Sequence, residues 1–215
     1  LVRSYRIAMD FHRVSGIILL VMLSGLLLNF LLLALGDLFF TKDTLCMLSR
    51  GRFALQALLG PFAVIAGTET ARRFKTSFLE QKRIVATAWI FTLTMIALGV
   101  KYQFHYDLEE IMLYGHIRFE PVAQQELYMI SATIGFILLF ISLLVYADQQ
   151  YALMFGVILV VMVGFALMRL LSGNKIFIIN DLLDWMLLAG LHKADKDSFV
   201  YAQFHKRLNK GKSRD

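Results

Sequence analysis

Residues 14–36 read VSGIILLVMLSGLLLNFLLLALG and contain no charged side chain. An α-helix rises 1.5 Å per residue, so about 20 consecutive apolar residues cross the roughly 30 Å hydrocarbon core of a bilayer. This stretch therefore predicts a transmembrane helix, and the rest of the chain has to be compatible with a membrane setting.

The composition of the whole chain agrees with this interpretation. Of its 215 residues, 58% are hydrophobic and 18% are charged, and the mean hydropathy is +0.64. Ordinary soluble domains are about 45–50% apolar and about 25% charged. The apolar residues are gathered in blocks separated by charged residues, without strand-like alternation or heptads. The sequence therefore predicts an all-α, polytopic bundle of transmembrane helices.

Five further apolar blocks follow the first one. They are residues 53–67, 84–100, 127–147, 149–168 and 176–191. The first of these five is short and contains Gly60 and Pro61, so we expect a kinked helix or one completed by residues before Arg52. Only Asp148 and two glutamines separate the third block from the fourth, which predicts a tight antiparallel helical hairpin.

The last block is ambiguous because Asn180, Asp181 and Asp184 interrupt it. These three residues fall on one helical face, with apolar residues opposite, so the segment either spans the membrane or lies at its interface as an amphipathic helix.

Lysine and arginine in short loops mark the cytoplasmic side of a membrane protein. Two such segments are the amino terminus and the basic loop, whose residues are Arg72, Arg73, Lys75, Lys82 and Arg83. The segment after Leu191 is also rich in lysine and arginine, whereas the 101–126 loop is acidic and is assigned to the outer side. Both termini are then cytoplasmic, which favours six spans over five in a cell (inner) membrane. We divide the chain into a transmembrane domain, 1–192, and a basic cytoplasmic tail, 193–215.

Charged residues within or beside spans are costly and mark either internal ion pairs or functional sites. The group here is Arg169, Lys175, Asp181 and Asp184. A hairpin turning near residues 172–174 would bring Arg169 close in depth to Asp181, and Asp184 would lie deeper. The group is either structural or part of a path for ions or protons.

The outer loop contains imidazole and carboxylate side chains of the kind that bind divalent metals. The candidates are His105, Asp107, Glu109 and His116. His105 and Glu109 are four apart and would share one face of a helix. The spacing matches no specific metal-binding motif, and an ordinary solvated acidic loop is the alternative.

Small residues four apart, such as Ala63 with Gly67 and Ser131 with Gly135, permit close approach of helices. These pairs serve either association between chains or packing within one chain.

Several classes of enzyme and cofactor protein lack support in the sequence. The single cysteine, Cys46, excludes an internal disulfide and a Cys-x-x-Cys motif. The five histidines lie outside the predicted spans or at their ends, which disfavours haem. There is no nucleophile elbow and no glycine-rich phosphate loop. We predict no cofactor, no catalytic residue and no nucleic-acid partner.

The leading hypothesis is a non-enzymatic multi-pass subunit that assembles with itself or with other membrane or cytoplasmic subunits. The basic loop either contacts anionic lipid headgroups or an acidic partner, or only sets the topology. A small ion or proton channel or transporter that uses Arg169, Asp181 and Asp184 is the alternative. A lipid-acting membrane enzyme that uses the outer-loop histidines and carboxylates is the third hypothesis.

Overall fold

The structure is a computed structural model that describes residues 14–76, 78–105, 107–113, 116–121, 125–172 and 177–212. Within these residues it contains seven helices and one two-stranded sheet. In chain order the elements are α2 (Val14–Phe39), α3 (Lys42–Leu59), α4 (Phe62–Arg73), α5 (Lys82–His105), β1 (Leu108–Leu113), β2 (His116–Pro121), α6 (Gln125–Gln149), α7 (Ala152–Ser172) and α8 (Phe177–Lys212). The predicted helical fold is confirmed.

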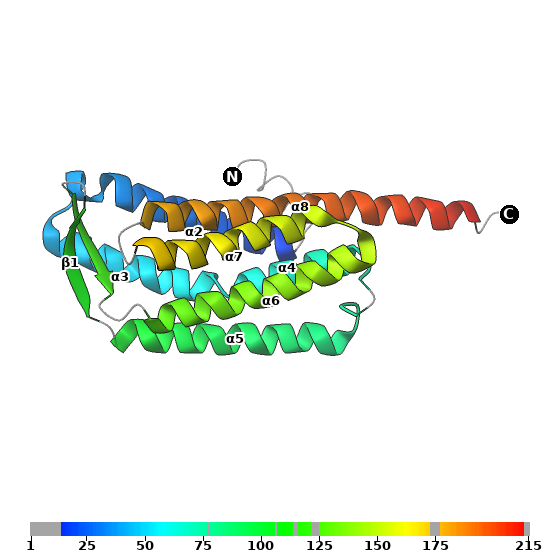
Figure 1. The fold of residues 1–215 in the computed structure, drawn as a ribbon, viewed down its shortest axis with the longest axis horizontal. Helices are drawn as coiled ribbons and strands as arrows, with labels where there is room; N and C mark the ends of the chain where they lie inside the picture. The colour runs from blue at the N-terminus through cyan, green and yellow to red at the C-terminus, as the bar shows by residue number, and fades with distance from the viewer. Residues whose placement is uncertain are drawn as a thin grey trace.

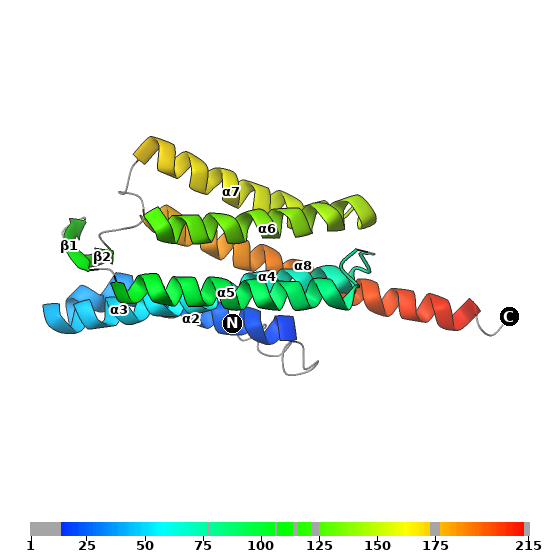
Figure 2. The same ribbon diagram turned by 90° about the horizontal axis from the view of Figure 1, so that it is seen from below.

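The helices run lengthwise beside one another in an elongated bundle (Figure 1). One end carries β1 and β2, and we call it the hairpin end. The other carries the described part of the α4–α5 loop, residues 74–76 and 78–81, and the turn between α6 and α7, and we call it the basic end. Helix α8 begins inside the bundle and projects past the other helices at the basic end, which is visible in both views (Figures 1 and 2).

Within the described residues, four segments are long and apolar enough to cross a membrane. They are Val14–Leu32, Lys42–Arg73, Lys82–Tyr102 and Met129–Gln149, and the apolar part of α7, Ala152–Leu167, is shorter. The second segment comprises α3 and α4, separated only by Gly60 and Pro61. Proline has no backbone N–H and interrupts the helical ladder, and the kink predicted at this position takes the form of a break between α3 and α4. The segment also starts ahead of Arg52, as expected.

The predicted helical hairpin of α6 and α7 is confirmed. Gln150 has a positive φ of 56°, and its backbone N–H donates to the carbonyl of Tyr146 at 2.9 Å, which ends α6 and reverses the chain. Gly135 lets α7 come close: a Cβ at this position would lie 2.1 Å from Met162 Sδ. The small residue therefore serves packing within this chain.

The core is formed where α2, α4, α6, α7 and α8 meet. Leu19, Leu138, Met154, Ile158 and Leu191 are all almost fully buried there.

Much of the outer surface is also apolar. Ile90 and Leu93 on α5 are 66% and 57% exposed, and Phe136 and Phe140 on α6 are 64% and 54% exposed. Such a surface is suited to contact with hydrocarbon, as the composition predicts.

The acidic loop contains an antiparallel hairpin in which Glu109 pairs with Glu120 and Ile111 with Arg118. The expectation that His105 and Glu109 share a helical face is therefore wrong, because α5 ends at His105 and Glu109 belongs to β1.

The ambiguous last block is part of the single long helix α8. Leu183 and Leu188 are buried, and the ring of Trp185 meets the ring of Phe30 on α2 edge to face, with centroids 6.2 Å apart. The helix continues unbroken through residues 192–193, where the tail was predicted to begin. Ala194, just after that boundary, is fully buried.

Candidate functional site at the basic end of the bundle

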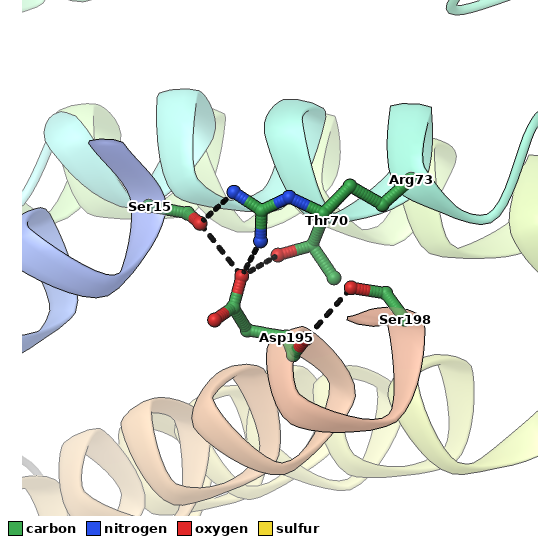
Figure 3. A network of polar contacts seen from close by, with 5 residues as sticks. All are labelled: Ser15, Thr70, Arg73, Asp195 and Ser198. Carbon is green, nitrogen blue, oxygen red and sulfur yellow. Dashed lines mark hydrogen bonds and ion pairs between the residues drawn. The ribbon is translucent and has the colours of Figure 1, made fainter. Parts of the chain in front are cut away.

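The site is centred on an ion pair between α4 and α8. Arg73 lies in the last turn of α4, and its guanidinium Nη1 contacts Oδ1 of Asp195 on α8. The side chain of Asp195 is 1% exposed and that of Arg73 is 20% exposed. Figure 3 shows the guanidinium reaching across from α4 toward the carboxylate. The carboxylate is therefore buried and the guanidinium mostly buried, and the two groups come from separate helices.

Hydroxyl groups complete the network around this pair (Figure 3). Ser15, at the start of α2, donates to Asp195 Oδ1 at 2.6 Å and accepts from Arg73 Nη2 at 2.7 Å. Thr70 Oγ1 lies 3.4 Å from the same carboxylate oxygen. Ser198 donates to the backbone carbonyl of Asp195 at 2.7 Å. Three helices are joined by one carboxylate.

Such a network specifies geometry more than it adds stability. Removing two charges from water costs several kcal/mol per ion, and the ion pair offsets this only when hydrogen bonds complete it. Here the hydroxyls of Ser15 and Thr70 supply hydrogen bonds to one of the two carboxylate oxygens, Oδ1 of Asp195. The arrangement therefore determines where α8 lies relative to α2 and α4.

An aromatic cluster flanks the ion pair. The ring centroid of Phe74, just after α4, lies 4.7 Å from that of Tyr151 and 5.7 Å from that of Tyr201. The hydroxyl of Tyr201 donates to Oε1 of Gln149, at the end of α6. These contacts connect the α4–α5 loop, the α6–α7 turn and α8.

A second carboxylate on α8 joins this cluster. Asp197 accepts from the Tyr151 hydroxyl at 2.8 Å and from Lys193 Nζ at 2.7 Å. Burial opposes ionisation of Asp197, but the hydrogen bonds from Lys193 and Tyr151 outweigh it and hold its pKa below the ordinary value. Burial, reinforced by the hydrogen bond and charge of Asp197, raises the pKa of Tyr151.

A hollow of about 370 Å³ opens beside the ion pair and is lined by Glu69, Arg72, Arg73 and Glu80. Within it, Arg72 Nη1 donates to Glu69 Oε1 at 2.9 Å. Two positive and two negative side chains line the hollow, so its formal charge balances.

The predicted basic loop divides into two parts in the structure. Lys75, Lys82 and Arg83 are exposed, as a solvated basic loop requires, and Arg72 lines the hollow. Arg73 instead points inward to Asp195. Sequence analysis missed Asp195 because it lies in a charged segment. A local signal does exist, since Leu191, Ala194, Asp195 and Ser198 have the spacing of one helical face.

The predicted intramembrane charges do not join this network as far as the structure describes them. Asp184 is half-buried on α8, 11 residues or roughly 16 Å before Asp195. The side chains of Arg169, Lys175 and Asp181 lie outside the described residues. The Arg169–Asp181 pair stays a prediction.

The predicted metal ligands are distributed over the hairpin end. Asp107 and Glu109 are exposed, and the side chains of His105 and His116 lie outside the described part of the chain. Among the residues whose side chains are described, no group of three or more His, Cys, Asp or Glu comes together.

Comparison with known proteins adds no relative: no protein-family model, curated protein or solved structure matches this chain.

Proposed function

We propose that this chain is a non-enzymatic, multi-pass subunit of a membrane assembly. In this proposal the bundle crosses the membrane six times, both termini and the basic end face the cytoplasm, and the projecting part of α8 binds a partner subunit or a second copy. The observation that carries the proposal is that α8 is one continuous helix that starts inside the bundle and ends beyond it (Figure 1).

The length of α8 supports this role. Its 36 residues correspond to roughly 54 Å, more than a bilayer core requires. Contacts with the bundle anchor the helix as far as Tyr201, whose ring packs on Phe74 and whose hydroxyl bonds to Gln149. The remaining turns project beyond the bundle, so they are available to another protein.

The charge of the projecting segment indicates the kind of partner. Its sequence contains Lys206, Arg207, Lys210 and Lys212 but no acidic residue before Asp215. A partner would therefore present an acidic surface, because complementary charge steers association and selects partners. The ion pair of Arg73 with Asp195 holds the base of the segment at a defined position on the bundle.

The lateral surface supports the membrane part of the proposal. Exposed apolar side chains on α5 and α6, such as Ile90 and Phe136, would face lipid. The packing of α8 along α2 and α7 favours six spans over five, because the first half of α8 follows the direction of the other helices (Figure 2).

The test is purification of the full chain from its native membrane in mild detergent. A stoichiometric partner or a homo-oligomer is expected. The double variant Lys206→Gln, Arg207→Gln should lose it, whereas the matched variant Lys82→Gln, Arg83→Gln should retain it. A monomeric wild-type chain, or equal retention by both variants, would contradict the proposal.

A further inference from the structure

The α4–α5 loop at the basic end holds an aromatic side chain outward. Phe78 is 46% exposed, whereas its neighbour Leu79 is 3% exposed and Thr76 is fully buried. The backbone N–H of Leu79 donates to the carbonyl of Thr76 at 3.0 Å, which closes a turn around Phe78. The chain is therefore anchored to the bundle on both sides of Phe78, and its ring projects from a fixed turn.

Positive side chains surround this ring. Lys75, Lys82 and Arg83 are exposed, and the one acidic residue between them is Glu80. The stretches 1–13 and 203–212, whose side chains lie outside the described residues, are themselves net basic in sequence and cannot offset this charge. The loop and the start of α5 therefore present a positive surface with an apolar ring in it.

The exposed face of α5 changes in character along its length. Lys82, Trp89 and Leu93 recur at i, i+7 and i+11, so they lie above one another on one face of the helix. At 1.5 Å per residue, Trp89 lies roughly 10 Å and Leu93 roughly 16 Å beyond Lys82. Trp89 is 38% exposed and Leu93 is 57% exposed. The order is a cation, then tryptophan, then an aliphatic side chain.

This order matches the layers of a bilayer. Lysine and arginine lie among the headgroups, tryptophan and tyrosine are enriched at the interface, and aliphatic side chains face the hydrocarbon. Helix α6 agrees: Tyr146, one turn before its end, is 39% exposed, and its ring stacks on that of Phe155 at 5.8 Å between centroids. Two neighbouring helices therefore place the α4–α5 loop at the depth of the headgroups.

Charge alone would fit an acidic protein as well as a lipid. A loop that only determined topology would need its cations but not an outward aromatic ring. The gradient from Lys82 to Leu93 on α5 favours lipid, because it continues from the loop into the apolar surface of the bundle.

We propose that Lys75, Phe78, Lys82 and Arg83 form a docking surface for anionic phospholipid headgroups, which we call the headgroup surface. The ammonium and guanidinium groups contact lipid phosphates, and the Phe78 ring inserts beside the upper part of the acyl chains. This inference rests on the membrane-crossing part of the proposed function, but it depends neither on a partner for α8 nor on the orientation of the chain.

The first experiment measures lipid binding by the full chain in uncharged detergent with native mass spectrometry. The probes are phosphatidylglycerol and phosphatidylcholine with the same acyl chains, and the wild type should prefer phosphatidylglycerol. A cation near an anionic surface contributes about fivefold in affinity. The triple variant Lys75→Gln, Lys82→Gln, Arg83→Gln should therefore bind phosphatidylglycerol about tenfold more weakly or worse.

The matched control removes the same number of charges from the projecting part of α8. Lys206→Gln, Arg207→Gln, Lys210→Gln should keep the lipid preference of the wild type. Equal losses in the two triple variants would show attraction to net charge alone and would overturn the inference. Glycerol phosphate has no acyl chains and should not compete; full competition would indicate a site for soluble phosphate and would also overturn it.

A second measurement places the loop directly and does not depend on the triple variant. In a Cys46→Ser background, Phe78→Cys carries an environment-sensitive fluorophore in lipid nanodiscs. Its emission should shift to shorter wavelength in phosphatidylglycerol relative to phosphatidylcholine, whereas a label at Val200→Cys, on the projecting helix, should not respond. A water-exposed signal at Phe78→Cys in both lipids would overturn the inference.

The outcomes separate this inference from the assembly role. A wild-type chain that is monomeric but selects phosphatidylglycerol would contradict only the assembly role. If the triple variant of the headgroup surface released a co-purified protein and kept its lipid preference, the surface would be a protein interface and the inference would be wrong.

Discussion

Arg73 and Asp195 lie 122 positions apart in the sequence and form a buried ion pair at the basic end of the bundle. The pair links the last turn of α4 to the middle of α8, and Ser15 connects it to α2. Contact between side chains so distant in sequence requires the helices to have the correct order and depth. The pair can therefore form only when α2, α4 and α8 are packed in their native positions.

Removal of the Asp195 charge should destabilise the protein strongly. Asp195→Asn leaves the guanidinium of Arg73 without its carboxylate, and breaking a buried pair in this way costs about 3–5 kcal/mol. The measurement is the free energy of unfolding in detergent by denaturant titration. Asp197→Asn is the matched control on the same helix, and it should cost about 1 kcal/mol or less because its partner Lys193 is 53% exposed.

The double variant Arg73→Met, Asp195→Leu separates loss of a charge from loss of packing. Both buried charges are removed together, so it should be more stable than either single variant. A double variant whose cost equals the sum of the two single costs would show that the side chains are not coupled.

The contact between Tyr151 and Asp197 predicts a response to pH. Hydrogen bonds hold the pKa of Asp197 below its ordinary value, so its contribution to stability is present above about pH 4 and is lost as the pH falls through the folded-state pKa. Asp197→Asn should abolish that part of the acid dependence. An unchanged acid limb of the unfolding curve would contradict this assignment.

Tyr151 should respond at the alkaline end. Its pKa is raised in the folded state, so its contribution is present below about pH 10 and is lost as the pH rises further. Spectroscopic titration should therefore show one tyrosine fewer ionising in the folded wild type near pH 10 than in the unfolded chain, and Tyr151→Phe should remove that difference. A difference that persists in Tyr151→Phe would assign the protected hydroxyl to another tyrosine.

The helices could be predicted from the sequence because a helix that crosses lipid requires a continuous apolar stretch, which is visible in neighbouring residues. The uncharged stretch 14–36 and the break at Pro61 each follow from neighbouring residues alone. The β-hairpin was missed because Leu108–Leu113, LEEIML, lacks the strict alternation of a half-buried strand. Its two strands pair with each other at the hairpin end. The spacing of apolar residues that predicts helices gives no information about such strand pairing.

The candidate site was missed for a different reason. Arg73 lies between Arg72 and Lys75 in a stretch whose positive charge already agrees with the topology rule, so composition cannot distinguish the inward-facing arginine from the solvated ones. Likewise Arg52 and Arg118 are 66 positions apart, and nothing local indicates that they share a cavity. Long-range pairing of charges depends on the tertiary arrangement.

Close packing of α7 and α8 depends on Gly190. A Cβ at this position would lie 2.5 Å from Val157 Cγ1, so Gly190→Ala forces the helices apart and should destabilise the fold by about 1–3 kcal/mol. Val157→Ala in the same chain should restore much of the loss. Gly156→Ala on α7 is the control: it meets nothing within 4 Å and should be neutral or stabilising by up to about 1 kcal/mol. Equal effects of the two glycine substitutions would show that the helices do not meet at Gly190.

The two ends of the bundle should be labelled from opposite sides of the membrane. In a Cys46→Ser background, Met112→Cys places a thiol on the hairpin, where the native side chain is 75% exposed, and Val200→Cys places one on α8, where it is 60% exposed. Because basic segments are retained in the cytoplasm, a membrane-impermeant maleimide should label Met112→Cys on intact cells and Val200→Cys only after permeabilisation. Lys75→Cys, also at the basic end, should follow Val200→Cys. The reverse pattern would invert the proposed orientation, and labelling of all three on intact cells would show that the bundle does not cross the membrane.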